Sequence, residues 1–314
     1  MAAYNSDEFI GRAIDSAINQ TLSDWELIII DDCSRDNTAT IALDYCKKDQ
    51  RIIYKRTEQN SGPSHARNIG MSLARGTWIT ILDSDDTFLA ERLERLVTIA
   101  ENDRLDFIAD NILYYDKDAD EIIGNAYHMP RPSMELTLLT FLLNCGAGRY
   151  FSFSLLKPLV RLSLLKETGI RYDEAIRVGE DFHFIFSILW NGTRAAVLSE
   201  ALYVYTLPFG LKSRRHSSTT RTDHSVTGWD AIVSAKLRVL DYAVSSAPER
   251  QVEIAALTNL IDAYRGEQHW RMIKHHIRSK NFHLALDAAM KNNTLRLIAK
   301  KIYYRLARTQ RIYQ

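Results

Sequence analysis

The chain has few cysteines and no long apolar run, and each of these shortages excludes a class of protein. Its three cysteines, Cys33, Cys46 and Cys145, are scattered and form no Cys-x-x-Cys pair. This argues against a disulfide framework or a zinc knuckle and indicates a reducing compartment. No stretch approaches the roughly 18 uninterrupted apolar residues that cross a bilayer. The start shows no secretory leader pattern, so we predict a cytoplasmic protein.

The net charge of +1 hides an uneven distribution along the chain. Residues 265–314 carry a net charge of +10, and residues 1–264 carry −9. A basic tail on an acidic body indicates an anionic partner, either membrane lipid or nucleic acid, although a solvated helical face explains the charges equally well. The tail pattern is typical of a basic amphipathic helix lying on an anionic membrane or of a helix packed on the body. Its apolar positions are Leu295, Ile298, Ile302 and Leu306.

Strand and helix signals alternate through the first half of the chain. Residues 25–30 and 78–82 are apolar runs of the buried-strand type. Helix signals cover residues 37–48 and 62–76, the second with proline in its first turn and glycine at its end. This order predicts an α/β fold with a mostly parallel sheet and helices on both faces. Ligands bind such sheets beyond the carboxyl ends of the strands.

The start and the end of the chain depart from this alternation. Residues 1–5 lead directly into a helix signal, so we expect the first strand of the sheet to be missing, through truncation or a late start codon. Such a loss would leave a gap or an unpaired edge in the sheet. Residues 225–314 have a helical pattern throughout. We therefore predict an α/β domain over residues 1–224 and a helical C-terminal extension over residues 225–314.

Two acidic clusters follow the apolar runs. The first acidic tip is Asp31-Asp32, and the second is residues 83–86, Asp83-Ser84-Asp85-Asp86. The three carboxylates of the second tip are so close together that they raise one another's pKa unless a positive charge neutralises them. A hard divalent cation would neutralise them and could bind a diphosphate. The simpler explanation is an acidic turn that caps the next helix. Because both tips follow strands, we predict that they converge on one pocket.

An ordered series of five segments resembles the inverting family 2 glycosyltransferases, which have the GT-A fold for nucleotide-diphospho-sugars. The resemblance covers about residues 1–205 and is greatest to the bacterial enzymes that build exopolysaccharide or other surface glycans. Ala2 stands where the family usually has proline, and Cys33 replaces the usual glycine. The five segments are Ala3-Tyr4-Asn5, residues 30–36, residues 60–70, residues 82–86 and Gly179-Glu180-Asp181.

The resemblance implies four contacts to the nucleotide-sugar. Tyr4 would stack its ring on uracil, and Asp32 would accept the imide N–H of uracil or thymine. Asp83 would bind the ribose or nucleotide. Arg67 lies one turn into a helix whose N-terminus favours anions, so it would contact the donor or the acidic cluster. Each of three residues also has a simpler explanation. Tyr4 could be an ordinary packed tyrosine, and Arg67 could form a surface salt bridge. Asp32 could cap the next helix, as Asp36 also could.

The resemblance also implies a metal ligand and a catalytic base. Asp85 would bind Mg²⁺ or Mn²⁺, which would bridge the two phosphates. Asp181 would take the proton of the acceptor hydroxyl, with Glu180 as the fallback, although either could simply cap a helix. His216, in the basic loop 209–223, would contact phosphate or complete the metal shell, unless it is merely solvated.

These features predict a metal-dependent glycosyltransferase. It would move a sugar from a nucleotide donor, expected to be a UDP-sugar, to a hydroxyl of a glycan acceptor, expected to be lipid-linked. A nucleotidyltransferase would need a glycine-rich loop with Lys or Arg, which residues 3–6 lack. A non-catalytic nucleic-acid or membrane-surface binding protein would act through the basic C-terminal helices, but a nucleic-acid binder predicts a basic body. We expect no nucleic-acid partner and possible peripheral binding to the inner face of the plasma membrane.

Overall fold

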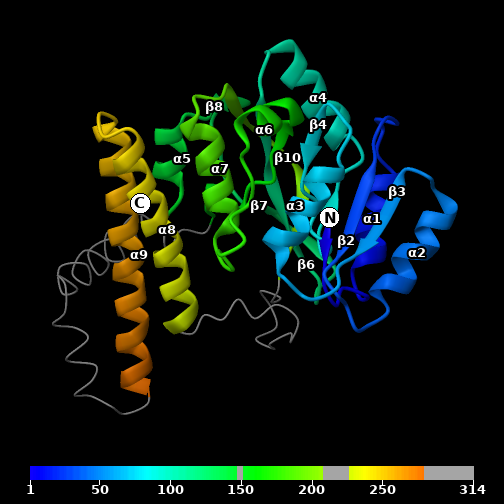
Figure 1. Cartoon of the computed structure of the whole chain (residues 1–314), viewed down its shortest axis with the longest axis horizontal. Coiled ribbons are helices and arrows are strands. Elements are labelled where there is room, and N and C mark those ends of the chain that lie inside the picture. Colours follow the sequence, from blue (N-terminus) through cyan, green and yellow to red (C-terminus); the bar gives the residue numbers. More distant parts are fainter. Residues whose placement is uncertain (147–150, 208–225, 279–314) are drawn as a thin grey trace, which may run out of the picture. The chain divides into compact units, whose positions relative to one another are not determined.

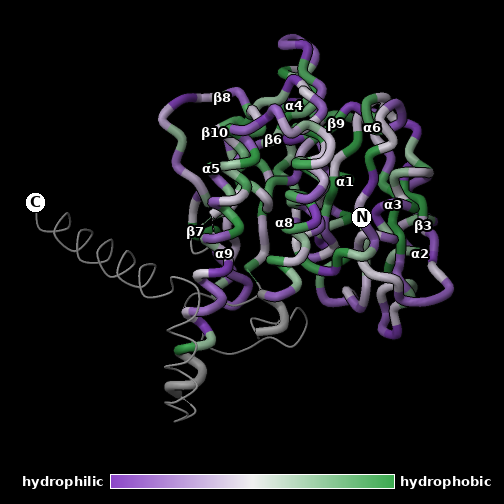
Figure 2. The backbone as a smooth tube through the Cα atoms, turned by 60° about the vertical axis from the view of Figure 1, so that its left-hand side comes forward, coloured by the Kyte–Doolittle hydropathy of each residue, from purple (hydrophilic) through white to green (hydrophobic). Residues whose placement is uncertain are grey.

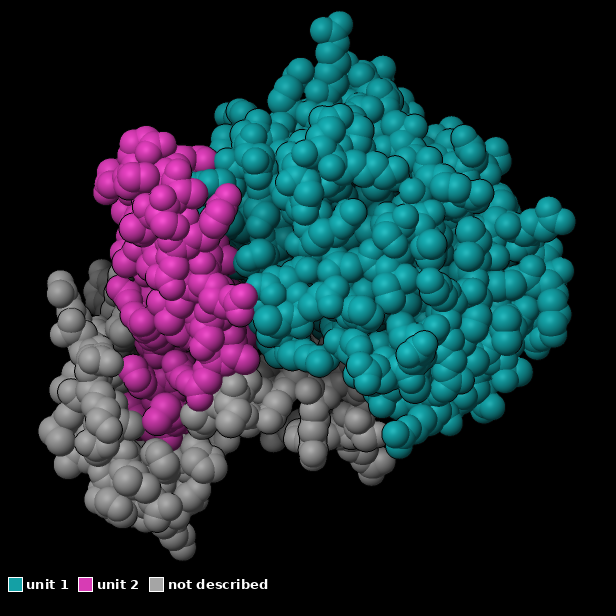
Figure 3. Space-filling model, viewed as in Figure 1, with its two compact units in different colours: residues 1–144, 150–221 teal, residues 145–149, 222–314 magenta. Residues whose placement is uncertain are grey.

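A computed structural model describes residues 1–146, 151–207 and 226–278 and divides the chain into two compact units. Unit 1 comprises residues 1–144 and 150–221, and unit 2 comprises residues 145–149 and 222–314 (Figure 3). In unit 2, helices α8 (Val226–Ser246) and α9 (Gln251–Arg278) contact each other. The domain division at residue 224 stays a prediction. Within the described ranges, no helix is long and apolar enough to cross a membrane.

A three-stranded parallel sheet forms the N-terminal part of unit 1, with the order β1 (Ala2–Ala3), β2 (Leu27–Asp31) and β3 (Ile52–Arg56). Every residue of β2 is buried, because helices lie on both of its faces. Helix α3 (Pro63–Leu73) packs its Ala66 against Ile28 and Ile30. Ile29 points to the opposite face, where α2 (Thr38–Lys48) contacts the sheet and α1 (Ile10–Ile18) contacts α2 (Figure 1).

Strand β1 has only two residues, and the expectation that the first strand of the sheet is otherwise missing stays a prediction. These two residues pair in parallel with Ile30 and Asp31 of β2. The Met1 amino group donates to the Ile28 carbonyl oxygen at 2.8 Å. Two alanines carry no apolar signal that a sequence pattern can detect, and the strand forms because the edge of β2 supplies a pairing partner.

A seven-stranded mixed sheet forms the rest of unit 1. Its main order is β4 (Trp78–Thr80), β9 (Leu159–Arg161), β6 (Phe107–Asp116), β10 (Ala195–Thr206) and β5 (Thr87–Phe88). Strand β7 (Glu121–Asn125) pairs with β6, and β8 (Ser133–Glu135) pairs with β10.

Strand direction differs between the two sheets. Strands β6 and β10 run parallel, whereas the other pairs of the seven-stranded sheet are antiparallel. The predicted α/β class with helices on both faces is confirmed. The mostly parallel order describes the first sheet but not the second, where β6 and β7 form a hairpin and the other antiparallel neighbours are far apart in the chain.

Helices pack on the second sheet through apolar faces. Helix α4 (Arg92–Asn102) buries Leu96 and Ala100 against Ile108 of β6. Helix α7 (Glu180–Trp190) is apolar on most sides and is accordingly buried. Figure 2 shows apolar stretches running through the strands and polar ones at the loops. The remaining elements are α5 (Leu138–Asn144), η1 (Phe153–Leu155) and α6 (Leu162–Thr168).

Candidate active site

The two acidic tips lie side by side, because one short segment bonds both of them. The Asn5 amide donates to the Ser34 hydroxyl at 3.0 Å, in the loop after the first tip. The Ser6 hydroxyl lies 2.8 Å from the hydroxyl of Ser84, within the second tip. Asn5 and Ser6 come after β1 and Tyr4, so this segment links the loops that follow β2 and β4. The two tips are therefore close together, and the prediction that they share one pocket stays a prediction.

In the first tip, Asp32 fixes the loop that leads into α3. Its buried carboxylate accepts hydrogen bonds from the amides of Ser61 at 2.9 Å and Gly62 at 2.6 Å and from the Thr57 hydroxyl at 3.2 Å. Gly62 has a φ of 92°, which favours glycine at this helix start. Asp32 does not cap α2; Asp36 accepts from the first amide of that helix at 3.0 Å.

Tyr4 lies at the end of β1, beside the first tip. Its side chain is 46% exposed, so the packed-tyrosine alternative does not describe it. A half-exposed aromatic ring next to an acidic strand end is placed as a stacking platform requires. The role of Tyr4 toward a base remains a prediction.

Two buried cations link the second tip to the start of α7. Arg67 lies 2.9 Å from Asp83, 2.9 Å from Glu180 and 3.4 Å from Asp181. Lys157 Nζ lies 2.8 Å from Asp83 Oδ2 and 2.7 Å from Asp181 Oδ2. We call these five residues the charged cluster. Arg67 thus contacts the acidic cluster, one of the two roles predicted for it.

Within the charged cluster, burial and ion pairing shift the pKa values of the paired side chains in opposite directions. Burial alone would lower the pKa of Arg67 and Lys157, but Asp181 and Asp83 outweigh it, so both pKa values lie well above the ordinary range. Burial would raise the pKa of Asp83, yet Lys157 and Arg67 hold it well below its usual value. Burial and the neighbouring Asp181 raise the pKa of Glu180. Asp83 therefore stays ionised, whereas Glu180 takes up a proton at a higher pH than an ordinary glutamate does.

The start of α7 presents Glu180 and Asp181 in its first turn. Gly179 precedes them with a φ of 86°, a backbone conformation that favours glycine. A helix N-terminus also stabilises carboxylates electrostatically. Local sequence therefore positions both acids, and the contacts with Arg67 and Lys157 set their orientation.

Asp85 and Asp86 have different environments although they are adjacent. Asp86 is fully buried and accepts from the Tyr203 hydroxyl at 2.6 Å and the Thr206 amide at 2.8 Å, so it holds the end of β10 and caps no helix. Burial and the nearby Asp83 raise the pKa of Asp85. Within the described residues, no hydrogen bond or ion pair reaches the Asp85 carboxyl from another residue.

The Asp85 carboxyl fits a hard divalent cation. A cation would stabilise its ionised form against burial and against Asp83. No group of three His, Cys, Asp or Glu side chains gathers as a complete metal site in the described part of the chain. Mg²⁺ usually binds through one or two carboxylates together with substrate phosphates and water, so a donor diphosphate would complete the coordination.

Lys157 was missed by reasoning from the sequence, and two predicted features lie outside the described residues. The signal for Lys157 was a lone lysine within the largely apolar residues 151–165, since lysine is almost never fully buried unless it is paired. His216 and the basic amphipathic tail fall in ranges that the structure does not describe.

Comparison with known sequences supports the same family as the residue pattern. The family model for glycosyl transferase family 2 matches residues 1–159. The succinoglycan biosynthesis protein ExoO of Rhizobium meliloti is 36% identical over 241 residues, which are 75% of this chain and 65% of that protein. The UDP-Glc:alpha-D-GlcNAc-diphosphoundecaprenol beta-1,3-glucosyltransferase WfgD of Escherichia coli is 33% identical over 150 residues, 47% of this chain and 55% of that protein. The chain thus spans less than two thirds of the length of these relatives.

Two solved structures share the fold at low sequence identity. TarS residues 1–349 of S. aureus, in complex with UDP-GlcNAc, has a TM-score of 0.57 and 21% identity, covering 91% of this chain and 88% of that one. The mannosyltransferase PcManGT of Pyrobaculum calidifontis, in complex with GDP-Man and Mn²⁺, has a TM-score of 0.56 and 14% identity, covering 99% and 81%. These likenesses confirm the predicted GT-A fold. With the family model matching just over half of its residues, the chain belongs to glycosyl transferase family 2.

Proposed function

We propose that the protein is an inverting glycosyltransferase that moves a sugar from a UDP-sugar to a hydroxyl of a glycan acceptor. The observation that carries this proposal is the charged cluster, in which Lys157 joins Asp83, beside the first tip, to Asp181 on α7. The cluster places a candidate base next to candidate donor-binding residues. Family membership and the UDP-GlcNAc complex of TarS support the same activity.

A lipid-linked acceptor in exopolysaccharide or surface-polysaccharide synthesis fits the names of the relatives. ExoO is named for succinoglycan biosynthesis, and WfgD for an acceptor carried on diphosphoundecaprenol. An acceptor of this kind is presented at a membrane surface. The reaction would then take place at the cytoplasmic face of the membrane, with the enzyme bound peripherally.

The residues at the tips would bind the donor by complementary chemistry. Tyr4 would stack on the base, and Asp32 would accept its imide N–H. Asp83 would contact the ribose. Arg67 would contact the donor diphosphate.

Asp85 would hold Mg²⁺ or Mn²⁺ against the donor diphosphate. The ion would supply positive charge that stabilises the departing nucleoside diphosphate. The Mn²⁺ and GDP-Man in the PcManGT structure support this assignment. Arg67 and Lys157, which their raised pKa values keep protonated, would offset the negative charge of Asp83 and Asp181 beside the diphosphate.

Asp181 would act as the base for the acceptor hydroxyl. It lies in the first turn of α7 and is 16% exposed, so an acceptor can reach it. Its contact with Lys157 at 2.7 Å orients the carboxylate. Glu180 bonds to Arg67 instead and remains the fallback.

The proposal predicts metal-dependent stabilisation by UDP. At a concentration of 100 times Kd, a ligand of the folded state adds about 2.7 kcal/mol to the free energy of unfolding, which raises Tm by several degrees. We expect this shift with UDP and Mn²⁺ together, and we expect EDTA to abolish it. Asp85→Ala should lose the manganese-dependent part of the shift. Differential scanning fluorimetry provides the measurement.

Asp103→Ala, at the C-terminal end of α4, is the matched control because it removes an exposed carboxylate near Arg194 at the start of β10, whereas Asp86 bonds to Thr206 at the opposite end of that strand. It should keep the full shift. If the wild type showed no manganese-dependent shift but bound RNA tightly and in a salt-sensitive way, the glycosyltransferase proposal would be wrong and a nucleic-acid binder would replace it.

Tyr4→Ala should weaken donor binding more than it slows the chemical step. Stacking of a base on an aromatic ring contributes about 1–3 kcal/mol, so we expect KM for the donor to rise roughly tenfold with kcat little changed. Tyr4→Phe keeps the ring and should behave like the wild type. Equal KM values for the Ala and Phe variants would exclude a stacking role.

A further inference from the structure

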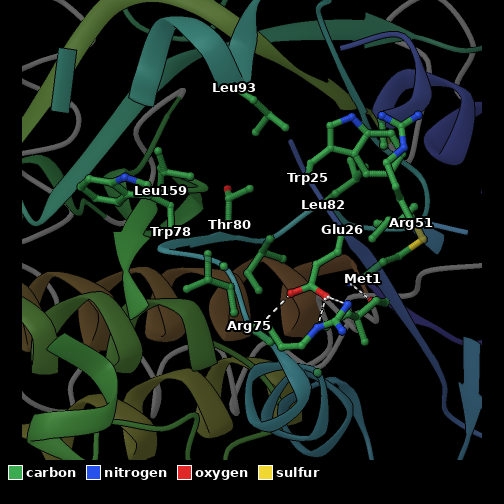
Figure 4. A pocket seen from close by; sticks show the side chains of 18 of the residues that line it. Met1, Trp25, Glu26, Arg51, Arg75, Trp78, Thr80, Leu82, Leu93 and Leu159 are labelled. Atoms are coloured by element: carbon green, nitrogen blue, oxygen red, sulfur yellow. Dashed lines mark hydrogen bonds and ion pairs between the residues drawn. The ribbon is translucent and has the colours of Figure 1, made fainter. Parts of the chain in front are cut away.

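A cavity of about 900 Å³ lies in unit 1 between β2 and β4, and it does not include the predicted base contacts. Trp25 and Glu26 line it from the side of β2, and Trp78 lines it from the side of β4 (Figure 4). Neither Tyr4 nor Asp32 is among the described residues that line it. A nucleobase stacked on Tyr4 would therefore be recognised by groups near Asp32, outside this cavity.

Arg177 is an exposed residue of the α6–α7 loop (residues 169–179), and its guanidinium lies against Gly62. The guanidinium occupies the space that a Cβ on Gly62 would need, with Arg177 Cζ 3.1 Å from that position. The Gly62 amide donates to the Asp32 carboxylate at 2.6 Å. One glycine therefore adjoins both a carboxylate that is a predicted base contact and a guanidinium.

The backbone that precedes Arg177 is held on α3. Asn68 and Tyr172 exchange two hydrogen bonds of 2.9 Å, one from Asn68 Nδ2 to the Tyr172 carbonyl oxygen and one from the Tyr172 amide to Asn68 Oδ1. The Ser64 hydroxyl donates to the Ile176 carbonyl oxygen at 3.3 Å, and the Ile176 side chain is buried. Because Ile176 directly precedes Arg177, the packing of the loop on α3 places the guanidinium beside Gly62.

The Arg177 side chain has no polar partner within the described part of the chain, since no hydrogen bond or ion pair reaches it there. It forms no ion pair with Asp32, although both side chains adjoin Gly62. A guanidinium has five N–H donors and no acceptor, and its planar shape suits recognition of paired oxygen acceptors. These donors are therefore available to a ligand that Asp32 also contacts.

We propose that Arg177 recognises the nucleobase together with Asp32 and selects uracil over cytosine, an inference that rests on the proposed UDP-sugar donor. Uracil presents an imide N–H beside a carbonyl oxygen. Because a carboxylate only accepts and a guanidinium only donates, Asp32 bonds to the N–H and Arg177 to the carbonyl oxygen. Cytosine presents an acceptor nitrogen and an amino donor at these two places, so it leaves both side chains unpaired. Guanine has the same N–H and carbonyl pair as uracil, so this pair does not exclude it.

Titration calorimetry of the full chain with UDP and with CDP, each in the presence of Mn²⁺, tests the proposal. The two ligands carry the same diphosphate and a pyrimidine of the same size. We expect the wild type to bind UDP more tightly than CDP. Arg177→Met should raise Kd for UDP roughly tenfold, which is a usual loss for one hydrogen bond from a charged group. Kd for CDP should change little, so the preference for UDP should fall by the same factor.

Arg171→Met is the matched control, because it removes another exposed arginine of the α6–α7 loop. Both of its Kd values should equal those of the wild type. Equal losses of UDP and CDP affinity in Arg177→Met would contradict base recognition and assign the guanidinium to the diphosphate. Unchanged UDP affinity in Arg177→Met, or equal binding of UDP and CDP by the wild type, would overturn the inference and leave the proposed function standing. Failure of the wild type to bind either nucleotide would overturn both.

Discussion

Asp181→Asn is expected to slow sugar transfer about 10³-fold, a typical contribution of a general base. The amide is nearly isosteric but cannot accept the acceptor's proton, so the chemical step loses about 4 kcal/mol of transition-state stabilisation. UDP binding should change little, because Asp83 still pairs with Arg67 and Lys157. Transfer rates with saturating donor, together with UDP titration of the same variant, provide the measurement.

Glu180→Gln is the matched control for Asp181→Asn, since it removes the adjacent carboxylate in the same helical turn. We expect it to reduce transfer less, because Glu180 bonds to Arg67 and not to Lys157. Unchanged turnover in Asp181→Asn with a large loss in Glu180→Gln would transfer the base role to Glu180. Loss of UDP binding in Asp181→Asn would instead indicate that Asp181 holds the charged cluster together.

Arg92→Met is expected to lower the free energy of unfolding by about 3–5 kcal/mol, the usual cost of leaving a buried charge without its partner. Arg92 and Asp110 are 0% and 1% exposed, and their nearest atoms lie 2.7 Å apart. Arg92 also donates to the Lys157 carbonyl oxygen, so its loss should disturb the backbone that carries the Lys157 side chain. Chemical denaturation monitored by circular dichroism provides the measurement.

Arg95→Met on the same helix is the control. Arg95 pairs with Glu200 at 2.9 Å, but these side chains are 53% and 44% exposed. Exposed ion pairs contribute about 0–1 kcal/mol, so this variant should unfold almost like the wild type. Similar losses in both variants would show that burial does not distinguish the two pairs.

The elements nearest to the acidic tips were predictable because their signals are local. An apolar run followed by aspartates indicates a strand end, and Pro63 marks the start of α3. The family resemblance placed Arg67 beside the acidic cluster, where the structure has it. The suggestion that Glu180 or Asp181 begins a helix agrees with α7, whose first turn contains both residues.

Long-range partners could not be predicted in the same way. Lys157 lies 74 residues after Asp83 in the chain, and no spacing rule connects them. Strand β1 has too few residues for a periodic signal and exists because β2 offers its edge. The antiparallel pairs of the second sheet mostly join strands far apart in the chain, such as β4 and β9, and hydrophobic periodicity does not encode such partners.

The sequence by itself determined the fold class, the family and the two acidic strand ends, since hydrophobic period and charge are properties of neighbouring residues. The tertiary structure alone decided that Arg67 and Lys157 bridge Asp83 to α7, and that a cavity separates β2 from β4. The same physical reason applies to the ion pairs and to the cavity. A buried charge is stable only with a partner, and a strand edge only with a neighbour or a cover. Only the folded chain determines which groups are close enough to serve.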